Sequence, residues 1–162
     1  MNPSARSAGF RPGAFLFLLA AVLAAGCRTG PPLPPADFCA PGWRVQQGQA
    51  VWKPTRSRPE LAGELLLATN LSGLFFVQFS KPPFSLATAQ TRNGEWQIEF
   101  GNGERRWSGR GDPPSRFAWF QLPGAMAGEA LKANWRFTRL PPDSWRLENR
   151  RTGESLEGGF FP

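Results

Sequence analysis

The fold of this 162-residue chain is indicated by the stretch Gly63–Phe100, GELLLATNLSGLFFVQFSKPPFSLATAQTRNGEWQIEF. It divides into four short apolar segments, separated by the turn-forming residues Asn70–Gly73, Lys81–Pro83 and Arg92–Gly94. In the last segment, Glu95–Phe100, apolar and polar residues alternate, which is the period of a strand with one buried face. The stretch therefore predicts four consecutive antiparallel strands in a curved sheet with an apolar concave face.

The concave face is the main candidate for a binding site. A single short helix covers only part of a deep sheet, and unfilled apolar volume favours an apolar ligand. The competing interpretation is that the same side chains pack on one another and on the helix, and so fill the interior. The residues that would line the cavity are Leu65, Leu67, Phe75, Val77, Phe79, Phe84, Leu86, Trp96, Ile98 and Phe100.

One helix is expected after these strands. Asp112 and Pro113 suit a helix cap and a first helical position, so we expect a helix of about ten residues that ends by Pro123–Gly124. Its aromatic face requires an apolar partner, and the hollow of the sheet provides one. The helix is therefore predicted to act as a lid, with Phe117, Trp119 and Phe120 toward the sheet.

The remaining segments are predicted mainly as strands. Glu104–Ser108 has the pattern of a basic edge strand, and alternation returns in three later segments. Trp43–Trp52 fits either an edge strand interrupted at Gly48 or a short helical piece, and the sequence leaves these two possibilities open. The later alternating segments are Leu131–Thr138, Trp145–Glu148 and Leu156–Phe161.

The composition argues against catalysis. Histidine is absent, which removes Ser-His-Asp and Cys-His catalysis and the usual zinc sites. A hydrolase with paired carboxylates stays conceivable, but each candidate acid fits a turn or a solvated strand face, and none lies in a recognisable motif. We therefore expect no enzymatic activity, cofactor or metal. The acids concerned are Asp112, Glu129, Asp143, Glu148 and Glu154.

The first 26 residues are organised like an export signal. Arg6 and Arg11 precede the apolar run Ala14–Ala25, which is too short for a membrane-spanning helix of about 20 residues. A charged start, a short apolar centre and small residues before a cleavage site are typical of a signal peptide.

The end of this signal resembles a lipobox, the cleavage motif of bacterial lipoproteins, in the residues Leu23–Cys27 (LAAGC). In that family the cysteine sulfur receives a diacylglycerol, and the amine is acylated after cleavage. The resemblance implies that Cys27 is the lipid attachment site, which would leave Cys39 without a disulfide partner. The alternative is ordinary cleavage after Ala25 or Gly26, which would leave Cys27 free to pair with Cys39.

The mature chain would begin at Cys27, with 17 basic against 12 acidic residues. This balance suits an anionic membrane surface, and no nucleic acid is expected as a partner. Residues 27–42 are rich in proline and predict an extended tether, followed by one folded domain over residues 43–162. In lipoproteins of Gram-negative bacteria, Asp after the acylated cysteine favours the inner membrane. Arg28 at that position therefore implies the outer membrane, with the domain facing the periplasm.

Four features of Gly63–Trp96 resemble the LolA/LolB-like superfamily of bacterial lipoprotein carriers and acceptors. They are the Gly-x-Leu-x-Leu pattern of Gly63–Leu67, the strand start Gly73–Phe75, the break Ser80–Pro83 and a strand ending near Trp96. The resemblance implies a mainly β fold: an antiparallel unclosed β-barrel, or half-barrel, with a helical lid over a cavity for acyl chains.

Two positions are less typical of that superfamily. An N-terminal helix, expected before the first strands, is not evident in Trp43–Arg58. LolB-like proteins also present an apolar residue on a protruding loop that contacts the membrane. Leu71, in the short turn Asn70–Gly73, is the candidate for that role here.

Together these features predict a monomeric, lipid-anchored outer-membrane protein that binds acyl chains and assists their delivery to that membrane. Its expected partners are membrane lipid and the acyl chains of lipoproteins, or a periplasmic carrier that brings them. The alternative is a non-catalytic envelope lipoprotein that acts as a protein-docking or structural module, for example through Arg105, Arg106 and Arg110.

Overall fold

A computed structural model describes residues 31–132 and 134–162 of the protein. The predicted signal peptide and the predicted acylation of Cys27 lie outside these residues and stay predictions. The described elements are β1 (Trp43–Lys53), β2 (Leu61–Asn70), β3 (Phe75–Lys81), β4 (Phe84–Arg92), β5 (Glu95–Phe100), β6 (Arg105–Arg110), α2 (Ala118–Ala127), β7 (Trp135–Leu140), β8 (Ser144–Asn149) and β9 (Ser155–Phe160).

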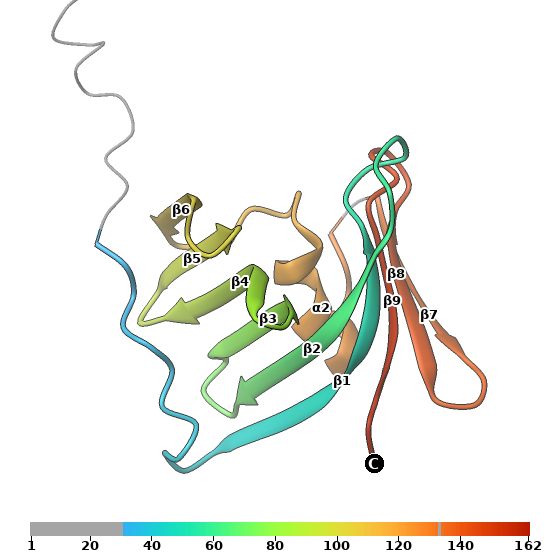
Figure 1. Ribbon diagram of the computed structural model, residues 1–162. Coiled ribbons are helices and arrows are strands. Elements are labelled where there is room, and N and C mark those ends of the chain that lie inside the picture. Colours follow the sequence, from blue (N-terminus) through green and yellow to red (C-terminus); the bar gives the residue numbers. More distant parts are fainter. Residues whose placement is uncertain (1–30, 133) are drawn as a thin grey trace, which may run out of the picture.

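All described strands belong to one antiparallel sheet, in the order β6-β5-β4-β3-β2-β1-β9-β8-β7. The sheet curls but does not close, so β6 and β7 form its two edges (Figure 1). This confirms the predicted mainly β, unclosed half-barrel fold with one short helix. The four strands predicted from Gly63–Phe100 correspond to β2–β5, and the predicted basic edge strand is β6.

β1 joins the two halves of the sheet. It pairs with β2 along most of its length, but with β9 only from Gly48 onward. A Cβ atom at Gly48 would collide with the backbone of Gly159, and one at Gly158 would collide with the backbone of Gln49. The glycines therefore permit a close approach of the two strands where the sheet changes direction. The segment that the sequence left undecided is thus a long strand, and Gly48 marks the junction.

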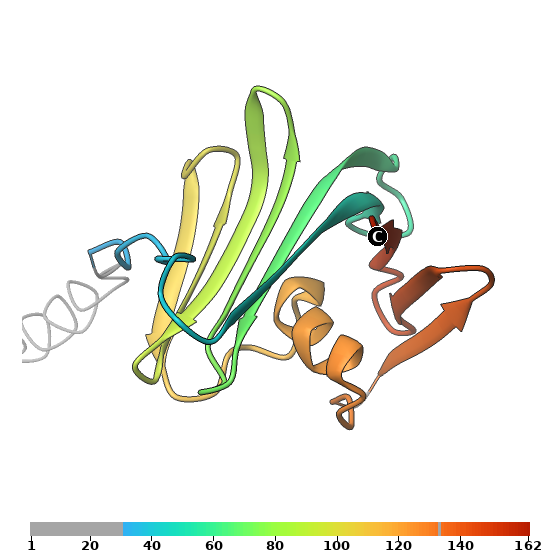
Figure 2. The same ribbon diagram turned by 90° about the horizontal axis from the view of Figure 1, so that it is seen from below.

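α2 lies inside the curve of the sheet and packs against β4 on one side and β8 on the other (Figure 2). The predicted start at Asp112 was wrong, because the helix begins at Ala118 with Phe117 as its N-cap residue. Asp112 and Pro113 each precede a proline, and that position disfavours the helical conformation.

The predicted end of the helix was also wrong. Pro123 lies inside α2, and the helix continues to Ala127, where Gly128 caps it in the left-handed conformation (φ 81°). Burial of the residues around Pro123 outweighs the loss of one backbone hydrogen bond, because most helix stability in proteins comes from tertiary packing.

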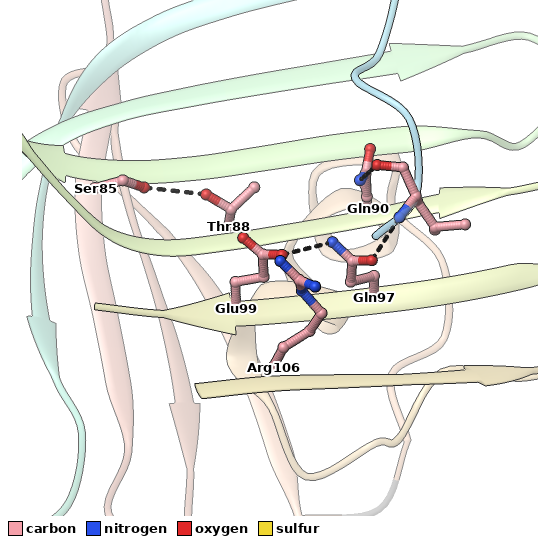
Figure 3. Close-up of polar contacts among 7 residues, drawn as sticks. Ser85, Thr88, Gln90, Gln97, Glu99 and Arg106 are labelled. Carbon is pink, nitrogen blue, oxygen red and sulfur yellow. Dashed lines mark hydrogen bonds and ion pairs between the residues drawn. The ribbon is translucent and has the colours of Figure 1, made fainter. Parts of the chain in front are cut away.

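The segment Leu33–Gly42, which we call the strap, belongs to the predicted extended tether, but it contacts the sheet. It lies across the outer face of the sheet rather than extending away from it. The Leu33 N–H donates to Gln97 Oε1 (2.7 Å), and Gln90 Nε2 donates to the Leu33 carbonyl (3.5 Å), as Figure 3 shows around the labelled glutamines. Phe38 contacts the rings of Phe76 and Trp43, with centroids 5.2 and 5.6 Å away. The strap therefore belongs to the folded domain.

Candidate functional site

The centre of the concave face is filled by α2. Trp119, 1% exposed, stacks on Phe79 (centroids 5.5 Å apart) and meets Trp52 edge-on (5.2 Å). Leu122 is completely buried beside it. The structure therefore differs from one continuous vacant cavity: among the described residues the helix occupies the middle, and a hollow lies toward each of its two ends. The predicted cavity residues packed here, each 1% exposed or less, are Leu65, Leu67, Val77, Phe79 and Ile98.

Three other predicted cavity residues, Phe75, Trp96 and Phe100, lie around this centre. Phe75 and Trp96 both contact the ring of Phe120, at 6.1 and 5.8 Å, so this part of the predicted lid does cover the sheet. Phe100 contacts Phe117 at 6.0 Å, near the start of α2.

Phe84 and Leu86 are separated by an irregularity in the sheet. The register between β3 and β4 shifts so that Phe79 pairs with Ala87 but Ser80 with Ser85, and Leu86 is the extra residue. Leu86 still packs against the core, whereas Phe84 reaches the end of the hairpin and is 58% exposed. Phe84 therefore lies outside the interior in which the sequence placed it.

At the N-terminal end of α2 lies a hollow of about 390 Å³, which we call the slot. Four aromatic rings form its walls, and they contact one another in a chain. The Trp52 and Phe100 rings are stacked 5.7 Å apart, Phe100 meets Trp107 at 5.8 Å, and Trp107 meets Phe117 at 6.1 Å. The full lining is Trp52, Pro54, Thr55, Phe100, Arg105, Trp107, Arg116, Phe117, Arg151, Thr152 and Glu154.

β6 contributes to the slot because of its register. Trp107 pairs with Ile98 and Arg105 with Phe100, so both side chains lie on the apolar side of the sheet. Trp107 is 37% exposed, which leaves the slot open to solvent. Trp52 and Trp107 are not among the site residues predicted from the sequence. The alternation within β6 could have predicted that Trp107 lies on the apolar side of the sheet. Trp52 could be placed at the slot only once the path of β1 was known.

Glu154 closes the inner end of the slot and is only 7% exposed. Its carboxylate accepts hydrogen bonds from Trp52 Nε1 (3.3 Å) and from the backbone N–H of Ala118, the first residue of α2. Burial raises its pKa from 4.5 to about 7, although both hydrogen bonds act in the opposite direction. The sequence predicted a turn or a solvated strand face for Glu154; it follows a turn, but it is buried rather than solvated. No local pattern shows that Trp52, 102 residues away, encloses it.

The other acids considered for catalysis are more accessible. Asp112, Glu129 and Asp143 are exposed and Glu148 is half-buried, so none of them shares the environment of Glu154. Asp112 lies 3.9 Å from Lys132 in a solvent-exposed ion pair. In residues 31–132 and 134–162, no group of three or more His, Cys, Asp or Glu residues is arranged to hold a metal ion.

A second hollow of about 690 Å³, which we call the wedge, lies toward the C-terminal end of α2. Its apolar side includes the predicted residues Leu67, Phe75 and Phe120, and its rim carries Arg44 and Arg139. The wedge is more polar than the slot, because amide, hydroxyl and charged groups interrupt its apolar surface.

Leu71, the predicted membrane-contact residue, lies at the tip of the turn between β2 and β3 and is 97% exposed. Asn70 organises this turn, since its Oδ1 accepts hydrogen bonds from Ser72 N (2.9 Å) and Ser72 Oγ (2.7 Å). Its carbonyl also accepts from Gly73 N at 3.0 Å. A tight turn thus presents one apolar side chain to solvent, and its role at a membrane stays a prediction. Cys39 is a free, exposed thiol in the strap.

Comparison with known proteins adds no family. No protein-family model matches the chain, and no curated protein matches it in sequence. The similarity to the LolA/LolB-like superfamily therefore stays a prediction from the residues. No described helix is long and apolar enough to cross a membrane.

Proposed function

We propose that this protein is a lipid-anchored envelope protein that binds acyl chains of lipids or lipoproteins in the slot and assists their delivery to the outer membrane. The observation that supports this best is the open hollow of about 390 Å³ walled by the rings of Trp52, Phe100, Trp107 and Phe117. Its volume lies within the range of about 300–1,000 Å³ that is common for small-molecule sites.

The mechanism is transfer by differences in affinity, without nucleotide and without bond chemistry. Each methylene that leaves water for an apolar surface contributes about 0.8 kcal/mol. The rings of the slot offer such a surface at an opening to solvent, where Trp107 is partly exposed. An acyl chain would enter there and later leave for the bilayer, which buries the chain more completely.

Lipid extraction and probe binding test this proposal. We expect acyl lipid in an organic extract of the purified protein, and saturable binding of a fluorescent fatty acid to the delipidated protein. Trp107→Ala should weaken probe binding by about tenfold, because it removes one wall worth roughly 1.4 kcal/mol of contact. Phe161→Ala is the matched control, since Phe161 is an exposed aromatic residue that does not line the slot.

The proposal fails if the extract contains no lipid and the probe does not saturate. It also fails if Trp107→Ala binds the probe as tightly as the unchanged protein, provided that both unfold at the same temperature.

A protein-docking or structural module is the second candidate, and the filled centre of the concave face favours it. Trp119 and Leu122 occupy the space that a large cargo would need. The edges β6 and β7 each carry backbone groups that pair with no further described strand, so either could receive a strand from a partner. A protein that contains no lipid but binds an envelope protein through β6 would support this alternative.

A further inference from the structure

The mouth of the slot gathers positive charge from three separate segments. Arg105 begins β6, Arg116 precedes α2, and Arg151 lies in the turn between β8 and β9. All three side chains are exposed, and none forms an ion pair within 4 Å with a described residue. The Arg116 guanidinium lies over the ring of Phe117, 4.6 Å from its centroid, and so forms part of the slot wall.

Little negative charge opposes these cations. Among the described residues that line the slot, Glu154 is the one acid, and it is held by Trp52 and by the start of α2. Burial raises the pKa of Glu154 to about 7, so its negative charge is only partly developed near neutral pH. The first turn of α2 contains no acidic residue, and the partial positive charge of this helix end points to the same place.

We propose that the slot selects an acyl amphiphile with an anionic head group, with the chain against the four rings and the head group at Arg105, Arg116 and Arg151. This inference rests on the proposed acyl-binding function. Guanidinium groups suit it because their planar donors match carboxylate and phosphate oxygens, often in pairs of parallel hydrogen bonds. The arginines on the rim thus set the preference for charge, while the rings bind the chain.

Two single-chain lipids of equal chain length separate these contributions: lysophosphatidylglycerol, which carries a net negative charge, and lysophosphatidylcholine, which carries none. Both are titrated below their micelle concentrations, with tryptophan fluorescence as the readout. We expect the unchanged protein to bind lysophosphatidylglycerol about tenfold more tightly, and the preference to shrink as salt rises. Inorganic phosphate should reduce this binding only to the level of lysophosphatidylcholine.

The decisive variant replaces Arg105, Arg116 and Arg151 by glutamine. It should bind both lipids with the affinity that the unchanged protein shows for lysophosphatidylcholine. The matched control makes the same replacement at Arg44, Arg92 and Arg136, which are exposed and lie outside the slot, and it should keep the preference. The control changes the net charge equally, so it separates the slot from general attraction.

The failures are distinguishable. Equal binding of the two lipids by the unchanged protein overturns the head-group selection and leaves acyl binding intact. Loss of the preference in the control triple variant also overturns it, since net charge would then explain the difference. Binding of neither lipid overturns the proposed function and this inference together, and tight binding of inorganic phosphate alone would make the slot a simple anion site.

Discussion

The inner and outer faces of β4 and β5 are covered in two different ways. On the inner face, Ala87, Ala89 and Ile98 are at most 1% exposed and lie under α2. On the outer face, polar side chains form a ladder of hydrogen-bonded groups. Gln97 Nε2 donates to Glu99 Oε1 (2.9 Å), Arg106 pairs with the same carboxylate oxygen, and Ser85 and Thr88 share a hydrogen bond (Figure 3).

Both faces are partly closed to solvent, although their chemistry is opposite. Gln90 and Gln97 are only 6% and 4% exposed, because the strap lies over them and bonds to both. Polar alternation in a strand therefore does not show that the face is wet. It shows that whatever covers the face must satisfy hydrogen bonds, which the backbone of Leu33 does here.

The inner face should show the largest effect of a single truncation. Trp119→Ala removes the ring between Phe79 and Trp52 and leaves a large cavity, so we expect a loss of about 3–5 kcal/mol in the free energy of unfolding. Urea unfolding followed by circular dichroism measures it. Phe161→Ala, at 59% exposure, should change stability by less than about 0.5 kcal/mol. Similar midpoints for the two variants would contradict the packed interior.

The pH dependence of stability should reveal the buried carboxyl group at the end of the inner face. The pKa of Glu154 is raised from 4.5 to about 7, so between these pH values the folded protein keeps a proton that the unfolded chain has lost. Stability should therefore fall as the pH rises through this window, by roughly 3 kcal/mol in total, and the penalty should be fully present above pH 7.

Glu154→Gln should remove this component, because the amide does not titrate and its oxygen can still accept the hydrogen bond from Trp52 Nε1. We expect the variant to show a flatter profile and to be more stable than the unchanged protein at pH 8. Urea midpoints from pH 4 to 8 measure the profiles, with the exposed Glu64→Gln as the control. Parallel profiles for the unchanged protein and Glu154→Gln would mean that this carboxyl group titrates normally.

On the outer face, Gln97→Ala should release the strap. The change removes the acceptor of the Leu33 N–H and the donor to Glu99, so we expect a loss of about 1–2 kcal/mol and much faster hydrogen exchange of the Leu33 amide. Ser108→Ala, on the neighbouring strand, is the control. An unchanged exchange rate at Leu33 would show that the strap is held by other contacts, such as that of Phe38.

The smallest effect is expected at the exposed end of the outer ladder. Arg110 Nε lies 3.0 Å from Glu95 Oε1, but its side chain is 87% exposed, so solvent screens the pair. Arg110→Ala should change the free energy of unfolding by less than about 0.5 kcal/mol. A comparable truncation, Arg106→Ala, removes a less exposed pair with Glu99 and should cost more. Equal losses in urea unfolding would mean that the exposure of these two ion pairs does not determine how much each contributes to stability.

Much of the fold could be predicted from the residues, and parts of the site could not. Alternation correctly predicted β5 and its inner row Trp96, Ile98 and Phe100, because successive side chains on a strand point to opposite faces. The helix was predicted in the right region, but its limits were wrong at both ends. Proline and cap rules are local, whereas Phe117–Ala127 is fixed by what it packs against.

The sequence by itself determined a mainly β chain with an apolar and a polar face on its central strands, and a composition without histidine. Only the tertiary structure decided what covers each face: Trp119 fills the centre, the strap closes the outer face, and Glu154 is buried at the slot. The physical reason is the range of the interactions. Strand alternation follows from backbone geometry over a few residues, but the contacts of Leu33 with Gln97 and of Trp52 with Glu154 join residues 64 and 102 positions apart.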